Sequence, residues 1–210
     1  LVLVAGSMSM VDVVSAQTVP FFLVQPMAFF VFLAGTSAEL NRTPFDVAEA
    51  ESELVAGYHT EFSGVKFALI QAAEFGGVAA AAAVIVTLFL GGWAGPASGY
   101  LGWLWFMITV GIIAFIFICI RATYPRLRVD QIMALAWKFL LPLSLINLLA
   151  TVLEVFFLRD DLGLLSTVDL WIMAGINVVL LVVAIGLFGN MIREKVRPVR
   201  WQPDTIPDIG

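Results

Sequence analysis

The sequence is poor in the residues that bind metals and redox cofactors. It has one cysteine, Cys119, and one histidine, His59, among 210 residues. One residue of each kind cannot form a disulfide, a cysteine-ligated iron–sulfur site, a bis-histidine haem or a zinc cage within the chain. We therefore expect no cofactor or metal to be bound by this chain alone, and any redox centre to belong to another subunit.

Charge is scarce as well. Charged residues make up 13% of the chain and the net charge is −5, whereas roughly a quarter of the residues in soluble proteins are charged. The sequence has no basic stripe that would neutralise phosphates, so nucleic acid is excluded as a partner. The 61% of hydrophobic residues instead predicts an integral membrane protein in contact with the lipid bilayer.

Long apolar runs are abundant. A membrane-spanning helix needs about 20 predominantly apolar residues. Five segments qualify, and a sixth is expected to be cut off before Gly6, because the chain opens without Met and is expected to be incomplete at its N-terminus. The five segments are 19–38, 67–91, 101–121, 135–157 and 168–192. The predicted fold is an all-α polytopic transmembrane helix bundle.

Lysines and arginines alternate between the connections of these spans. They occur near residues 42–66, near residues 121–138 and in the tail, but are nearly absent around Pro96 and Asp160. The positive-inside rule then places the acidic loop 39–66, the arginine loop 121–134 and the C-terminal tail in the cytoplasm. We expect an upstream part (1–18), a membrane domain (19–192) and a cytoplasmic tail (193–210), in a multi-pass protein of the cell (inner) membrane.

The acidic loop concentrates carboxylates in a chain that otherwise avoids them. Asp46 followed by Glu49 resembles a capping box, and the helix expected over 47–56 places Glu51 on its apolar side. A run of charge is usually a solvated face. The apolar position of Glu51, together with arginines in the second loop on the same side, favours a partly buried polar network instead.

Glu74 lies inside the second long apolar segment. Gln71 shares its helix face, and Gly76-Gly77 follows, which permits close approach of another helix. A carboxylate inside a span costs about 2.5 to 3.5 kcal/mol. Two interpretations stay open: a neutral Glu74 hydrogen-bonded to a neighbouring helix, and a proton or ion relay.

Two other polar positions in the spans receive simpler interpretations. Glu154 is near the outer end of its span, and we expect its side chain to snorkel toward the membrane surface. Gln25-Pro26 interrupts the first span and is interpreted as a kink.

Two motifs, in sequential order, resemble a known family. The first is ELNRTPFD (39–46), followed by EAESELVAGY (49–58) and EF (61–62). The second is RATYPRLR (121–128), followed by DQ (130–131) and WK (137–138). Together they resemble the H subunit (subunit 1) of respiratory complex I, the proton-translocating NADH:quinone oxidoreductase, over about residues 6–142.

The resemblance implies that the chain forms the membrane part of a quinone chamber and the start of a proton-coupling path. The acids that match the family's proton-coupling positions are Glu39, Glu49, Glu51, Glu53, Glu61 and Glu74. The residues that match its quinone-chamber loops are Arg42, Asp46, Arg121, Arg126, Arg128 and Asp130.

The resemblance also implies cofactors and partners. Quinone is the substrate, while FMN and the iron–sulfur clusters reside in partner subunits. The expected partners are the quinone-site and terminal iron–sulfur-cluster subunits and a neighbouring small membrane subunit. Three alternatives stay open: a homologous subunit of a membrane-bound hydrogenase or ferredoxin-linked pump without quinone, a stand-alone ion carrier, and a passive scaffold.

Overall fold

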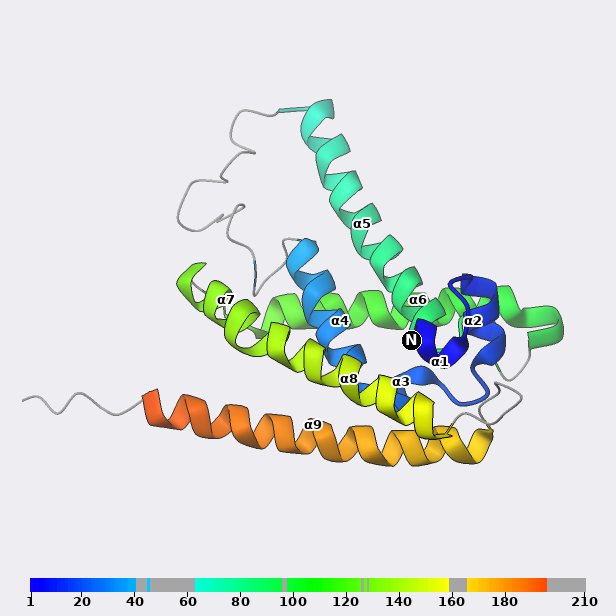
Figure 1. Cartoon of the computed structure of the whole chain (residues 1–210). Coiled ribbons are helices and arrows are strands. Elements are labelled where there is room, and N and C mark those ends of the chain that lie inside the picture. The colour runs from blue at the N-terminus through cyan, green and yellow to red at the C-terminus, as the bar shows by residue number, and fades with distance from the viewer. Residues whose placement is uncertain are drawn as a thin grey trace, which may run out of the picture.

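The computed structural model describes residues 1–40, 45, 63–95, 98–125, 127, 129–158 and 166–195 (Figure 1). Every secondary-structure element in these ranges is a helix, which confirms the all-α expectation. In chain order they are α1 (Val2–Ala5), α2 (Met10–Ala16), α3 (Phe21–Val24), α4 (Pro26–Glu39), α5 (Val65–Phe89), α6 (Ser98–Thr123), α7 (Val129–Leu135), the π-helix η2 (Ala136–Leu140), α8 (Leu141–Leu158) and α9 (Thr167–Lys195).

Four stretches of helix in the described part are long and apolar enough to cross a membrane. They are Val65–Phe89, Tyr100–Thr123, Val129–Leu158 and Thr167–Gly186. Each overlaps one predicted span. Large apolar side chains remain on their outer surface, such as Phe156 and Phe157, which are 77% and 76% exposed. Such exposure suits lipid, which is as apolar as the protein interior.

The first predicted span, 19–38, is not one continuous helix. It divides into α3 and α4 at Gln25, whose backbone adopts φ −131° and ψ 66°. Pro26 explains the break, because a proline disfavours the helical conformation in the residue before it and is well suited to the first turn of a new helix. The interpretation of Gln25-Pro26 as a simple kink was therefore incomplete, since the chain stops one helix and starts another there.

The helices α7, η2 and α8 follow one another without interruption and form the 30-residue span Val129–Leu158. The wider π-turn of η2 immediately precedes Pro142. Proline has no N–H to donate to the carbonyl four residues earlier, which favours such a local widening. The predicted arginine loop is correspondingly shorter than 121–134, because Arg121 lies in the last turn of α6 and Asp130 in the first turn of α7.

Two groups of buried apolar side chains hold the helices together. One joins α5 to α6 and includes Ile85, Val86 and Phe117. The other gathers the N-terminal helices against α8 and α9. Phe29 of α4 and Phe89 of α5 connect them by an edge-to-face contact with ring centroids 5.2 Å apart, a geometry that aromatic pairs favour.

The helix ends that flank the predicted cytoplasmic segments lie toward one half of the molecule. In Figure 1 the end of α6, the start of α7 and the end of α9 lie on the left, while the start of α6, the end of α8 and the start of α9 lie on the right. The end of α4 and the start of α5 lie above the left and central part of the view. Which side of the membrane this half faces stays a prediction.

Candidate functional site

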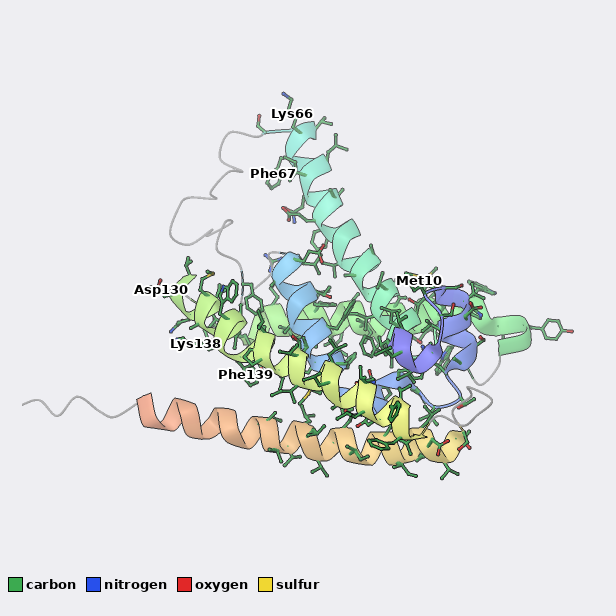
Figure 2. The ribbon with its side chains drawn as sticks, viewed as in Figure 1. Met10, Lys66, Phe67, Asp130, Lys138 and Phe139 are labelled. Atoms are coloured by element: carbon green, nitrogen blue, oxygen red, sulfur yellow. The ribbon has the colours of Figure 1, made fainter. Side chains whose placement is uncertain are left out.

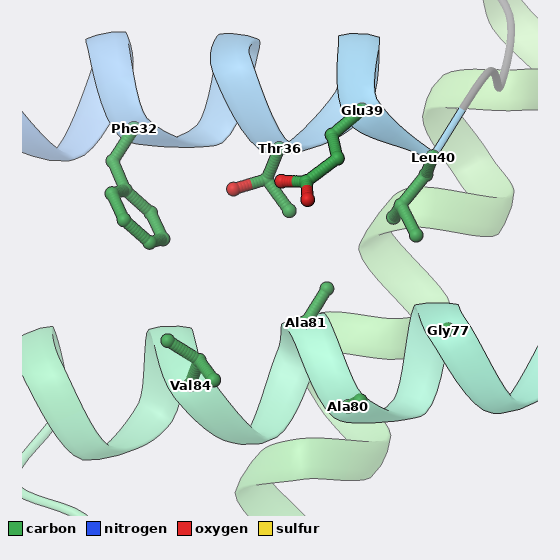
Figure 3. Close-up of a pocket in the computed structure, with 8 residues that line it drawn as sticks. All are labelled: Phe32, Thr36, Glu39, Leu40, Gly77, Ala80, Ala81 and Val84. Carbon is green, nitrogen blue, oxygen red and sulfur yellow. The ribbon is translucent and has the colours of Figure 1, made fainter.

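A groove of about 420 Å³ lies between α4 and α5 (Figure 3). Phe32 and Leu40 of α4 lie at its two ends, and the side chains of Thr36 and Glu39 extend between them toward α5. The facing residues on α5 are Gly77, Ala80, Ala81 and Val84. The groove thus combines an apolar wall with one exposed carboxylate and one hydroxyl, and has room for several water molecules.

Small residues on α5 create this space. Gly77 is where the two helices approach most tightly on this side, because a Cβ at that position would lie 3.3 Å from Cδ2 of Leu40. A Cβ on Gly76 would meet no atom within 4 Å. Of the glycine pair expected to permit close helix approach, only Gly77 does so here.

One of the predicted acids lines the groove, and another lies near it on α5. Glu39 lines the groove at the end of α4, beside the Leu40 that contacts the Gly77 position. Glu74 precedes Gly77 on α5 by three residues, about one helical turn, and its side chain is half-buried. One carboxylate therefore lines the groove, and a second lies on the facing helix about one turn before the groove residue Gly77.

Arg121 joins this region from α6. It lines a second, smaller cavity of about 130 Å³ together with Phe75, Val78 and Ala79 of α5 and Ala114, Phe117 and Ile118 of α6. Phe75 follows Glu74 directly, so the arginine is positioned beside the α5 turn that carries the acid. The apolar α5–α6 interface holds it there, because Val78 and Phe117 belong to the buried core between the two helices.

Asp130 is exposed in the first turn of α7 (Figure 2). An acid suits that position, because the N-terminus of a helix carries partial positive charge. Asp130 lines neither of the two cavities just described. Glu39 therefore lines the groove between α4 and α5, Arg121 lines a separate cavity between α5 and α6, and Asp130 lies on another helix end.

The remaining predicted site residues lie outside the described ranges. They are Arg42, Asp46, Glu49, Glu51, Glu53, Glu61, Arg126 and Arg128. The helix expected over 47–56 falls in the same part of the chain. Their roles stay predictions.

One polar position was assigned wrongly from the sequence. Glu154, expected to snorkel, is buried with 7% of its surface exposed, and it accepts a hydrogen bond from Asn177 Nδ2 at 2.9 Å. The signal that could have revealed this is the spacing of Asn147, Thr151 and Glu154, which puts three polar residues on one face of α8.

The described residues contain no group of three His, Cys, Asp or Glu side chains arranged to hold a metal ion. Glu39 and Glu74 can each take up and release a proton, as carboxyl groups do.

Comparison with known proteins places these features in a family. The NADH dehydrogenase family pattern matches residues 1–152. The H subunit of an NADH-quinone oxidoreductase from Dehalococcoides mccartyi (strain 195) is 48% identical over 189 residues, covering 90% of this chain and 51% of the relative. Subunits of the same name from Geobacillus kaustophilus and Deinococcus radiodurans are 52% and 40% identical, over 71% and 87% of this chain and 46% and 49% of their own lengths. The chain thus spans about half the length of these curated relatives.

Proposed function

This chain belongs to the NADH dehydrogenase family, and from that premise we propose that it serves as a membrane subunit of a proton-translocating NADH:quinone oxidoreductase. In this role it contributes part of the quinone chamber and the start of the proton-coupling path. The redox centres, FMN and iron–sulfur clusters, reside in partner subunits, and quinone is the substrate. The acidic loop, the arginine loop and the C-terminal tail face the cytoplasm.

The observation that carries the proposal is the α4–α5 groove, which Glu39 lines and whose facing residue Gly77 lies about one helical turn after Glu74 on α5. A carboxylate within an apolar helix pair is costly, by about 2.5 to 3.5 kcal/mol at the centre of a span. Such a residue is retained where its protonation is useful. The groove gives water access to Glu39. Glu74 lies on α5 about one turn before the groove residue Gly77. In this proposal a proton passes between the two acids.

The chain's own residues act through electrostatics in this proposal. Reduction of quinone changes charge and proton demand near the loops, and the carboxylates of the acidic loop respond by binding or releasing protons. Glu39, at the junction of that loop with α4, passes the change to Glu74. Arg121, at the neighbouring end of α6, stabilises the ionised acids, since opposite charges at short range favour the charged form.

The experiment is substitution of Glu39→Gln and Glu74→Gln in the assembled complex. Glutamine keeps the shape and hydrogen-bonding capacity but cannot exchange the proton. We expect proton pumping and NADH:quinone reductase activity to fall together by about tenfold or more, because positioned proton transfer contributes about 100-fold or more to catalysis. The matched control is Asp12→Asn, which neutralises an exposed acid on α2.

Assembly must be measured on a native gel, because loss of the complex would mimic loss of proton transfer. Wild-type pumping in both assembled Gln variants would exclude the relay. Full pumping with an electron donor other than NADH, and without any quinone requirement, would instead identify the hydrogenase-like alternative.

A further inference from the structure

A second polar site lies within the bundle, away from the α4–α5 groove. Asn147, Thr151 and Glu154 occupy positions i, i+4 and i+7 of α8 and so share one face. Thr151 and Glu154 are 3% and 7% exposed. This face is covered by α4 and α9, both of which pack against α8.

Gln25 reaches this face from the break between α3 and α4. Its side chain is 1% exposed, and its Nε2 donates a hydrogen bond to Thr151 Oγ1 at 3.1 Å. The Thr151 hydroxyl in turn donates to the main-chain oxygen of Asn147 at 2.8 Å. The break at Pro26 is therefore what brings a primary amide to the buried face of α8.

Asn177 reaches the same face from α9 and is fully buried. Its Nδ2 donates to Glu154 Oε2 at 2.9 Å and to the main-chain oxygen of Met173 at 3.0 Å. Rotation of the amide by half a turn would put Oδ1 against these two acceptors. The hydrogen-bond pattern therefore fixes the orientation of the amide.

The site lacks donors. Within the described part of the chain, five buried side-chain oxygens have no hydrogen-bond partner. One is Oε1 of Gln17, which follows α2 and whose amide nitrogen bonds to the end of α5. The other four belong to this site: Gln25 Oε1, Asn147 Oδ1, Glu154 Oε1 and Asn177 Oδ1. Leaving a buried polar atom unpaired costs about 1 to 3 kcal/mol. A further acceptor would not relieve this cost, whereas a proton or a donor molecule would.

We propose that Glu154 is a proton-binding site that holds its proton as a neutral carboxylic acid paired with Asn177. A carboxylic acid and a primary amide are complementary, because the amide N–H donates to one acid oxygen while the acid O–H donates to the amide oxygen. The first of these bonds is present between Nδ2 and Oε2. One proton on Glu154 Oε1 removes the buried charge and lets this oxygen donate a hydrogen bond to Asn177 Oδ1. Both of these atoms otherwise lack a partner. The oxygens of Gln25 and Asn147 remain available to accept a hydrogen bond from a further donor.

This proton site is separate from the groove. Gln25 and Glu39 are at opposite ends of α4, whose 14 residues span about 21 Å. The titratable side chains on the elements packed against α8 are Lys138 of η2, Glu39 of α4, and Asp169, Arg193, Glu194 and Lys195 of α9, while α1 carries none. Each is more than two turns along its own helix from Gln25, Asn177 or Glu154. The proposal rests on these contacts and not on the quinone reductase activity.

Infrared difference spectroscopy of the assembled complex in lipid tests the proposal. The spectrum of Glu154→Gln is subtracted from that of wild type near neutral pH, in H2O and in D2O. We expect loss of one carboxylic-acid C=O band that moves to lower frequency in D2O. Asn177→Leu should shift this band to higher frequency, because the acid carbonyl loses its donor. Asp169→Asn, the matched control on α9, should leave it unchanged.

The variants also separate the proposal from a merely structural role. Gln at 154 can form the same two-point pair with Asn177 as a neutral acid, so Glu154→Gln should assemble normally on a native gel, whereas Glu154→Leu should lower the yield of complex. Loss of carboxylate bands in place of the acid band would show that Glu154 is ionised and overturn the proposal. A sodium-dependent change in those bands would assign the site to a cation instead.

Discussion

Cδ2 of Leu40 lies 3.3 Å from the position that a Cβ on Gly77 would occupy. Both residues line the α4–α5 groove, as does the neighbouring Glu39. A side chain added at residue 77 would occupy the groove, whereas one added at residue 76 would enter open space.

Filling the groove should therefore impair the enzyme. We expect Gly77→Leu to displace Leu40 and lower quinone reductase activity several-fold. Gly77→Ala should cost little activity, since a 3.3 Å contact with the flexible end of a leucine is relieved by a small movement. Gly76→Leu is the matched control, and equal losses at the two positions would show that the groove is not involved.

Gln17 should stabilise the end of α5. Its Nε2 donates to the main-chain oxygens of Thr87 and Leu88, both at 3.0 Å, and the last carbonyls of a helix have no partner within it. Gln17→Leu should lower stability by about 1 to 3 kcal/mol. Thermal inactivation of the membrane-bound complex measures this, with the neighbouring exposed Thr18→Val as control. Unchanged inactivation in Gln17→Leu would mean that water replaces the cap.

Arginine should not be replaceable by lysine at positions 121, 126 and 128. Arg121→Lys keeps the charge beside the α5 turn of Glu74 but loses the planar fork of donors. We expect Arg121→Lys to lower quinone reductase activity. Arg126→Lys and Arg128→Lys, at the predicted quinone entrance, should have the same effect. Lys66→Arg, at the start of α5, is the control. Normal turnover and inhibitor sensitivity in all three Lys variants would leave only topological anchoring.

The predicted topology can be tested with single cysteines. Cys119→Ser removes the native thiol, which is exposed on α6. A cysteine at position 52 should then react with an impermeant reagent only from the cytoplasm, and one at position 98 only from the opposite side, as the distribution of lysine and arginine requires. The reverse pattern would invert the whole assignment.

Composition and motifs determined much of this protein. Thirteen per cent charge and long apolar runs are sufficient to predict a helical membrane protein. The segments 39–62 and 121–138 identified the family, because their motifs do not depend on knowing which helices touch. Gln25-Pro26 marked one irregular point of the spans in advance, since proline constrains the backbone wherever it stands.

Only the tertiary structure decided which polar residues are buried and which acid lines the groove. The helices are apolar on all sides, and lipid is as apolar as the protein core, so hydrophobic periodicity does not reveal which face packs inward. The depth of Glu154 along its span predicted a place near the surface, whereas the polar face that it shares with Asn147 and Thr151 indicates burial. Its contact with Asn177 on α9 depends on how the two helices pack. Likewise, Glu39 and Glu74 are 35 positions apart, and their places near one groove depend on Leu40 packing at Gly77, an approach of two helices that the order of residues does not specify.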